Sequence, residues 1–380
     1  MTDISAVYEN TIAGHVDTAN AVAFGYARHA IVAALTAAGL KPDDEVILSP
    51  LTCKVVPLAL LSMGLKPVYA DISPDTLNIN HAEVQEKITT ATRAILFQHT
   101  YGHPGGVEDI ASLARQMNIF MIEDCAQCMP LRIDNYHPGQ HGNVAIFSNN
   151  AGKPLSAGSG GIAVTNDVML TEEMRKLRDT MSHRKLADDL LISMETWLHH
   201  HLLRPSLYWL LFTLRRRIDS NYSQHSLDAE IANEITKTAM QPSSRQLRRG
   251  LHAMRHITSV AHHRITCCKD FHASLGPANR PGTLFESGKA PLYYYPVLTD
   301  HKPELLQLAR QSRVEIIPWP ISTPIYPVED IAALGVYGYR AGDCPEAESV
   351  AARLVGLPTH IKITPEVRKQ IISLVQTQVR

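Results

Sequence analysis

A single lysine in a stretch of small residues is the first candidate for chemistry. The stretch "SNNAGKPLSAGSGG" (148–161) places Lys153 between the apolar runs "VAIF" and "IAVT". Its glycines allow backbone turns that other residues resist. A lysine in a partly desolvated pocket has a lowered pKa and becomes a nucleophilic amine, whereas a lysine in an exposed loop is an ordinary surface residue. The residues that lie near Lys153 in the fold therefore decide its role.

Three other groups of residues could act together with such an amine. "IEDCAQ" ends an apolar run with Asp124, followed by Gln127. A carboxylate there serves as a helix cap, as part of a structural ion pair, or as the partner of a buried cation. "FGYARHAI" places residues 26–28 before a helical pattern, and backbone N–H groups at a helix start bind anions. Ser148 closes the run "NVAIF" with a hydroxyl.

The elements expected around these residues form an alternating α/β pattern. Between residues 21 and 167, apolar runs such as "DEVILSP" and "TRAILFQHT" alternate with helical patterns such as "VEDIASLARQMN". This alternation predicts a mostly parallel sheet with helices on both faces, and such sheets bind ligands at the carboxyl ends of their strands. Residues 169–255 have a helical pattern. We therefore expect a large domain over residues 1–255, with a helical insertion at about residues 184–220.

The C-terminal part of the chain predicts a smaller α+β domain over residues 256–380. Its predicted strands are "APLYYYPVLTD" (290–300) and "VEIIPWP" (314–320). Its predicted helices include "CPEAESVAARLVGL" (344–357) and "TPEVRKQIISLVQTQV" (364–379). The mixture of the two patterns separates this part from the helical segment before it.

The composition and the N-terminal sequence argue against a nucleic-acid-binding, secreted or membrane-spanning protein. The chain has 380 residues with 36 basic and 37 acidic side chains, so its charge favours no nucleic-acid partner. We see no signal peptide and no run of roughly 18 apolar residues that could span a membrane, and we expect a cytoplasmic protein. Cys125 and Cys128 form a C-x-x-C pair. Without a second ligand pair at similar spacing, we expect buried thiols and no metal.

Together these residues supply what a protein needs to hold pyridoxal 5′-phosphate (PLP). The aldehyde of this cofactor bonds to a lysine amine, its pyridine nitrogen needs a carboxylate to stay protonated, and its phosphate needs backbone donors and hydroxyls. Lys153, Asp124 and the helix start at residues 26–28 match these three needs. The sequence therefore predicts PLP as the cofactor.

The chain resembles the DegT/DnrJ/EryC1/StrS family of fold-type-I PLP-dependent aminotransferases. The likeness begins with "DEVILSPLTCKVVPLALLSMGLKPVYADISPDTLNI", continues through "HTYGHPGGVEDI", "IEDCAQ" and "FSNNAGKPLSAGSGGIAVTND", and ends with "CPEAESVAARLVGLPTH". It implies a large domain with a mostly parallel seven-stranded sheet between helices, plus a smaller α+β C-terminal domain. It also implies a homodimer with active sites shared between the subunits.

The resemblance assigns roles to residues position by position. Lys153 resembles the lysine that bonds to the cofactor and then moves a proton. Asp124 resembles the partner of the pyridinium nitrogen. Gln127 matches the residue that hydrogen-bonds the ring hydroxyl, and Ser148 matches a serine that binds the phosphate.

The chain departs from the family pattern in three places. The phosphate-binding turn, usually Ser-Gly-Thr, reads Tyr26, Ala27 and Arg28, so we expect its backbone to bind the phosphate. Cys53 replaces the aromatic residue that stacks on the cofactor ring. Ser159 in "GSGG" replaces the acidic residue of the usual Gly-Glu-Gly-Gly. These changes favour an altered pocket for the acceptor.

The resemblance implies amino transfer from an amino acid, with glutamate as the expected donor, to a keto or aldehyde acceptor. The expected acceptor is a keto nucleotide-sugar. Alternatives are a non-nucleotide acceptor (a lipid, polyketide or cyclitol-like carbonyl) and a non-catalytic PLP-binding member, against which Lys153 argues. The family also has an asparagine that reaches into the partner subunit's site. Asn221 is the first candidate for it and Asn233 the second.

The apolar segment Leu202–Arg217 has no counterpart that we recognise in typical sugar aminotransferases. Arg204 and Pro205 interrupt it, and three arginines end it. The main interpretation is a helix packed on the core or on a dimer partner. The alternative is a peripheral membrane contact, with Trp209 and Phe212 at the interface and the arginines facing lipid head groups.

Overall fold

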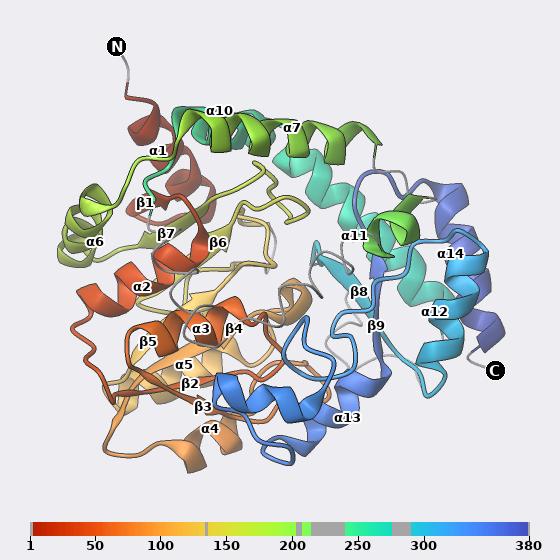
Figure 1. The fold of residues 1–380 in the computed structure, drawn as a ribbon, viewed down its shortest axis with the longest axis horizontal. Coiled ribbons are helices and arrows are strands. Elements are labelled where there is room, and N and C mark those ends of the chain that lie inside the picture. Colours follow the sequence, from red (N-terminus) through yellow and green to blue (C-terminus); the bar gives the residue numbers. More distant parts are fainter. Residues whose placement is uncertain (1–2, 134–135, 203–206, 214–239, 276–289, 379–380) are drawn as a thin grey trace.

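A computed structural model describes residues 3–133, 136–202, 207–213, 240–275 and 290–378 of the chain (Figure 1). The first part of the chain forms a large sheet with helices on both sides. The C-terminal part forms a second group of helices around two strands, drawn on the right of Figure 1. The site depends on the place where these two parts meet.

The large sheet contains seven strands. They are β1 (Asn20–Phe24), β2 (Glu45–Leu48), β3 (Lys66–Tyr69), β4 (Thr92–Gln98), β5 (Phe120–Asp124), β6 (Val144–Ser148) and β7 (Gly161–Thr165). Their order across the sheet is β1-β7-β6-β5-β4-β2-β3. Strands β2 to β6 pair in parallel, and β7 runs antiparallel to both of its neighbours. The predicted mostly parallel seven-stranded sheet is confirmed.

Helices cover both faces of this sheet. They are α1 (Ile4–Val16), α2 (Ala27–Ala37), α3 (Val55–Ser62), α4 (His81–Lys87), α5 (Val107–Gln116), α6 (Val168–Thr180), α7 (Leu186–Leu202) and α10 (Ser244–Met254). Helices α2 and α3 share a core with Val46 and Leu48, while α4 and α5 share one with Ile47 and Ile95. Successive strand residues point to opposite faces, so these strands are apolar throughout because both faces are buried.

The C-terminal elements build a core of their own. They are α11 (Ile257–Ser274), β8 (Tyr294–Leu298), α12 (Lys302–Gln311), α13 (Pro345–Arg353), β9 (Leu354–Pro358) and α14 (Pro365–Gln378). Strands β8 and β9 pair antiparallel. Helix α11 contributes Ala261 to a core of the large sheet and Phe271 to the C-terminal core, so it joins the two parts.

Two predicted C-terminal elements are wrong in type. Of the predicted strand at residues 314–320, Ile317 alone forms a bridge, to Gly356. The segment contains Pro318 and Pro320, which have no N–H group to donate to a ladder. The predicted helix at residues 344–357 stops at Arg353, and its last four residues begin β9. A short apolar run does not distinguish a buried strand from a helix, and here the pairing with β8 decides.

The segment Leu202–Arg217 is described in part. Residues 203–206 and 214–217 lie outside the described residues. Trp209 is 5% exposed, packs in the C-terminal core and donates from Nε1 to the Val314 carbonyl at 2.7 Å. The ring of Phe212 packs against it. The alternative that placed Trp209 at a membrane interface is therefore wrong. No helix among the described residues is long and apolar enough to cross a membrane.

Candidate active site

The carboxyl ends of β5 and β6 bring two predicted site residues to one edge of the sheet. Asp124 ends β5, opposite Gln98 at the end of β4, and Ser148 ends the neighbouring strand β6. Asp124 is 4% exposed and Ser148 is 5% exposed. Because these strands are parallel, their last residues lie at the same edge, where ligands bind in sheets of this class.

Asp124 is a buried carboxylate in an environment that favours a cationic neighbour. Its Oδ1 atom accepts a hydrogen bond from the backbone N–H of Ala126 at 2.9 Å. Burial raises the pKa of Asp124, and the Ala126 N–H with the charges of Lys153 and His99 offsets only part of that rise. A cation placed beside such a carboxyl group stabilises its charged form. The site therefore suits a protonated ring nitrogen.

Lys153 lies in the loop between β6 and β7. Its backbone N–H donates to the Asn150 carbonyl at 3.0 Å, and Gly152 before it has a φ of 83°. The half-buried side chain places Nζ 5.5 Å from the ring centroid of Tyr293, which directly precedes β8. The amine thus lies between the sheet edge and the C-terminal part, close enough for its charge to act on Asp124.

Gly161 lets this loop approach the start of α2. A Cβ atom at this position would lie 2.3 Å from both the backbone N and the Cα of Ala27. Side chains do not fit at such distances, and both atoms belong to the backbone, which cannot rotate away. A glycine at the start of β7 therefore holds the lysine loop against the predicted phosphate turn.

We expect Gly161→Ala to separate β7 from α2. The overpacking should lower the free energy of unfolding by about 3 kcal/mol, the upper end for a small-to-large change. Urea unfolding measures this loss. Gly335→Ala is the matched control, because a Cβ there would meet nothing within 4 Å. Equal stability of the two variants would contradict the close approach.

The start of α2 is rich in positive charge. Tyr26 is the N-cap residue, with extended backbone and without a hydrogen bond from its side chain to the cap. The guanidinium of Arg28 lies 4.3 Å from the Tyr26 ring centroid, and that of Arg184 lies 5.1 Å from it. Two cations add to the positive end of the helix dipole. The predicted turn of Tyr26, Ala27 and Arg28 therefore suits an anion such as a phosphate.

Arg184 is a site residue that the sequence did not reveal. Its Nη1 atom donates to the Ser159 hydroxyl at 2.6 Å, and its Nη2 atom donates to the Gly25 carbonyl at 3.1 Å. It thereby joins the loop of Lys153 to the turn before α2. No motif marks this position, which lies at the beginning of the predicted insertion.

Gln127 is fixed by a neighbouring turn. Its Oε1 atom accepts from the backbone N–H of Tyr101 at 2.8 Å. With that oxygen engaged, the donor end of the amide is the part that can serve a ligand. The Tyr101 carbonyl accepts from the backbone N–H of Tyr293 at 2.8 Å. The strand end of β5 is therefore connected through Tyr101 to the C-terminal aromatic residue beside Lys153.

Cys53 is half-buried in a turn held by two other segments. It forms a bridge with Tyr326, and the neighbouring Lys54 N–H donates to the Tyr326 carbonyl at 2.8 Å. The Thr52 hydroxyl donates to Gln98 Oε1 at 2.8 Å, at the end of β4. The structure thus ties the Cys53 turn to the sheet edge that carries Asp124. Its contact with a cofactor ring stays a prediction.

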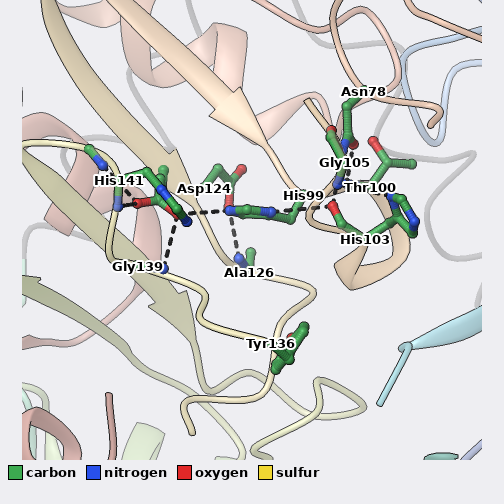
Figure 2. A network of polar contacts seen from close by, with 12 residues as sticks. Asn78, His99, Thr100, His103, Gly105, Asp124, Ala126, Tyr136, Gly139 and His141 are labelled. Atoms are coloured by element: carbon green, nitrogen blue, oxygen red, sulfur yellow. Dashed lines mark hydrogen bonds and ion pairs between the residues drawn. The ribbon is translucent and has the colours of Figure 1, made fainter. Parts of the chain in front are cut away.

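Glu123, which precedes Asp124 in β5, forms a buried ion pair with His99, whose ring is labelled in Figure 2. Glu123 is fully buried and accepts from the backbone N–H groups of Gly139, His141 and Gly142. It also pairs with His99 Nε2 at 2.9 Å. His99 Nδ1 faces the His103 carbonyl at 3.2 Å. Both ring nitrogens therefore face acceptors, which is the pattern of an imidazolium cation.

The electrostatics of this pair agree with that pattern. Burial opposes the charge on His99, but Cys128, Glu123 and the His103 carbonyl outweigh it and raise the pKa of His99 to about 9. Burial likewise opposes the charge on Glu123, but His99 and the backbone donors hold its pKa below the usual value. The pair is charged at neutral pH and fixes the strand end that carries Asp124.

We expect Glu123→Gln to lower the free energy of unfolding by about 3 to 5 kcal/mol, as for a buried pair that loses one partner. An amide would leave the imidazolium unpaired and point its NH₂ group at backbone donors. Because the pKa of His99 is raised from 6.5 to about 9, the wild type should hold its extra stability below pH 6.5 and lose it as the pH rises to about 9.

Urea unfolding across that pH range measures this difference. The change Glu108→Gln, at an exposed position of α5, is the control. Parallel pH curves for the wild type and Glu123→Gln would contradict a charged His99–Glu123 pair.

His99, Cys125 and Cys128 form a buried cluster beside this pair, with their ligand-type atoms all within 4.8 Å of one another. Metal ligation would need a lone pair on the imidazole. Both His99 nitrogens face acceptors instead. The arrangement is therefore that of a cation beside two thiols, which does not favour a metal.

Two predicted residues cannot be placed. Asn221 and Asn233, the candidates for the contact with a partner subunit, lie outside the described residues. The other predicted residues are described, and those of the sheet edge, the Lys153 loop and the α2 turn come together around one region.

Comparison with known proteins yields a family and several relatives. The model of the DegT/DnrJ/EryC1/StrS aminotransferase family matches residues 3–194. The GDP-perosamine synthase of Escherichia coli O157:H7 is 36% identical over 165 residues, covering 43% of this chain and 45% of that protein. The UDP-N-acetyl-3-dehydro-alpha-D-glucosamine 3-aminotransferase of Acidithiobacillus ferrooxidans is 33% identical over 184 residues, covering 48% and 50%. The matches thus span about half the length of these relatives.

A solved structure supports the fold over a greater length. DesV of S. venezuelae, in complex with a ketimine intermediate, superposes with a TM-score of 0.75 at 23% identity. The superposition covers 100% of this chain and 90% of that chain. At this identity the likeness establishes the fold.

Proposed function

Because the chain belongs to the DegT/DnrJ/EryC1/StrS aminotransferase family, we propose that it is a PLP-dependent aminotransferase that acts on the carbonyl group of a sugar. The observation that carries the proposal is the placement of Lys153, with its charge acting on the buried Asp124. Two relatives, one named a perosamine synthase and the other an aminotransferase of an acetylglucosamine nucleotide, support the sugar as substrate class.

The residues present fit this cofactor. Asp124 offers a buried carboxyl group in need of a cation, and the start of α2 offers positive charge to a phosphate. Among the described residues, His29 Nε2 and Arg184 Nε are buried nitrogens without a hydrogen-bond partner in the protein. Burial and the charge of Arg28 lower the pKa of His29 to about 3, so it is a neutral donor or acceptor. Both side chains lie beside the ring of Tyr26, at the predicted phosphate turn.

When bound, PLP supplies an electron sink that makes the carbon next to an amino group acidic. Asp124 would hold the proton at the ring nitrogen, which keeps that sink effective. Gln127 would donate to the ring hydroxyl through its amide nitrogen. The backbone of Tyr26, Ala27 and Arg28 and the hydroxyl of Ser148 would hold the phosphate.

Lys153 has two tasks in the proposed reaction. Its Nζ atom would hold the cofactor through the aldehyde. As a free amine, the same Nζ atom would accept and return the proton that amino transfer moves. The ring of Tyr293 bounds the space in which this amine moves.

The finer parts of the proposal are the donor, the acceptor and the assembly. We take glutamate as donor and a keto nucleotide-sugar as acceptor, with a non-nucleotide carbonyl as the alternative. We also propose a homodimer, with Asn221 reaching the partner's site. Cys53 in place of an aromatic residue supports a pocket that differs from that of the usual family member.

Incubation with glutamate and a panel of acceptors tests this function. We expect 2-oxoglutarate to be released with keto nucleotide-sugars. Release with long-chain aldehydes alone would instead favour the non-nucleotide acceptor. No release with any acceptor, although the protein binds PLP, would favour a non-catalytic family member.

A further inference from the structure

Cys125 and Cys128 stand directly beside residues of the proposed cofactor site. Cys125 follows Asp124, and Cys128 follows Gln127. The backbone N–H of Cys128 donates to the Cys125 carbonyl at 2.9 Å, so a tight turn brings the two residues together. Their sulfur atoms lie within 4.8 Å of each other. A turn of this kind holds two thiols near the distance from which a disulfide forms.

The two thiols differ in their surroundings. Burial raises the pKa of Cys128, but hydrogen bonds from Cys125 and Tyr136 and the charge of His99 outweigh burial and hold it below the usual value. Burial and the neighbouring Cys128 raise the pKa of Cys125 well above its usual value. Cys128 is therefore the more acidic thiol of the pair, and Cys125 is the thiol that can attack it after oxidation.

The other buried cysteines lack this asymmetry. Burial raises the pKa of Cys267, Cys268 and Cys344. Cys267 and Cys268 are adjacent in α11, where neighbouring residues point in different directions. Cys128, in contrast, lies beside a cation (His99), a hydroxyl donor (Tyr136) and a second thiol (Cys125).

We propose that Cys125 and Cys128 form an oxidisable dithiol that closes to a disulfide on reaction with a hydroperoxide, and that this closure weakens cofactor binding. The Cys128 thiolate attacks the peroxide oxygen and becomes a sulfenic acid, while the other peroxide oxygen leaves and takes up a proton to give water or an alcohol. The Cys125 thiol then attacks the Cys128 sulfur and expels water, so two thiols are oxidised and one peroxide is reduced.

Burial restricts the oxidant. Cys125 is 0% exposed and Cys128 is 2% exposed, so a protein disulfide or a bulky reagent cannot reach them. A hydroperoxide is little larger than water and can enter through brief local opening of the turn. The reaction is therefore selective for small peroxides.

Closure would act on the site through two contacts. It draws the turn of residues 125–128 together, and this turn carries Gln127, whose Oε1 atom holds the Tyr101 N–H. It also removes the negative sulfur from the side of His99, whose ion pair with Glu123 fixes the end of β5. Both effects disturb Asp124 and Gln127, so this second half of the proposal rests on the proposed function.

Mass spectrometry of the full-length protein, treated with hydrogen peroxide and then alkylated in urea to expose the buried thiols, tests the first half. Trypsin releases both thiols in one peptide, "QMNIFMIEDCAQCMPLR" (116–132). We expect this peptide to lose 2 Da and both alkylation sites, and to regain them with dithiothreitol. The peptide "ITCCK" (265–269), which holds the adjacent pair, should stay fully alkylated. Alkylation of both thiols of the first peptide after peroxide would overturn the proposal.

A variant and a binding measurement complete the test. Cys125→Ala should stop Cys128 at the sulfenic acid, which dimedone traps once the protein is unfolded in urea, whereas the wild type should yield little trapped product. Oxidation of the wild type should raise the dissociation constant for PLP by about tenfold, or 1.4 kcal/mol. An unchanged constant would overturn the second half. If the reduced protein binds no PLP, the proposed function fails while the disulfide result still stands.

Discussion

Lys153→Ala is expected to reduce amino transfer by about 10⁴-fold, the upper end for loss of a positioned acid–base group. The variant loses both the atom that bonds to the cofactor and the amine that moves the proton. Release of 2-oxoglutarate from glutamate measures the loss. The structure supports this expectation because the Lys153 charge acts on the buried Asp124 and its amine faces Tyr293.

Two further variants distinguish the proton transfer by Lys153 from the effect of its positive charge. Lys153→Arg keeps a cation between Tyr293 and Asp124, but a guanidinium stays protonated and cannot move the proton. It should be as inactive as Lys153→Ala. Lys176→Ala, an exposed lysine paired with Glu173, should be fully active. Substantial activity in Lys153→Arg would contradict the assigned role.

Asp124→Asn is expected to reduce the turnover rate by about 10²- to 10³-fold, as for the loss of one preorganised electrostatic group. An amide cannot hold a proton at the ring nitrogen. Burial raises the pKa of Asp124, so its charge costs stability in the cofactor-free protein. With a raised pKa, that cost grows as the pH rises through it. The variant should therefore be as stable as the wild type or more stable at neutral pH.

Two measurements on Asp124→Asn distinguish a catalytic role of Asp124 from a purely structural one. Turnover with glutamate gives the loss of activity, and urea unfolding without cofactor gives the stability. A purely structural role for Asp124 predicts that both fall together. Low activity with preserved stability supports the assigned role, and full activity would contradict it.

Sequence periodicity was sufficient to predict the mostly parallel sheet and the polar residues at the ends of its strands. Asp124 and Ser148 end neighbouring parallel strands, and strand direction alone brings such ends to one edge. The glycines around Lys153 made it a candidate, and its role was assigned from Asp124, the start of α2 and the resemblance to the family. Chemistry-bearing residues on parallel strands are therefore predictable from local patterns.

Contacts between distant segments were not predictable in this way. Arg184 reaches Ser159 and Gly25 from a helical region that carries no motif. His99 is a cation only because the fold places Glu123 and the His103 carbonyl on its two nitrogens. Strand β9, which begins at Leu354, is defined by its pairing with β8 and was predicted as part of a helix. Each of these depends on tertiary packing rather than on local spacing.

The absorbance spectrum of the purified wild type, reconstituted with PLP, tests the central claim most directly. The claim is that Lys153 bonds to the cofactor and that an amino donor then releases it. We predict a near-visible absorbance band that disappears when glutamate is added. A protein that stays colourless after reconstitution with excess PLP would contradict the claim.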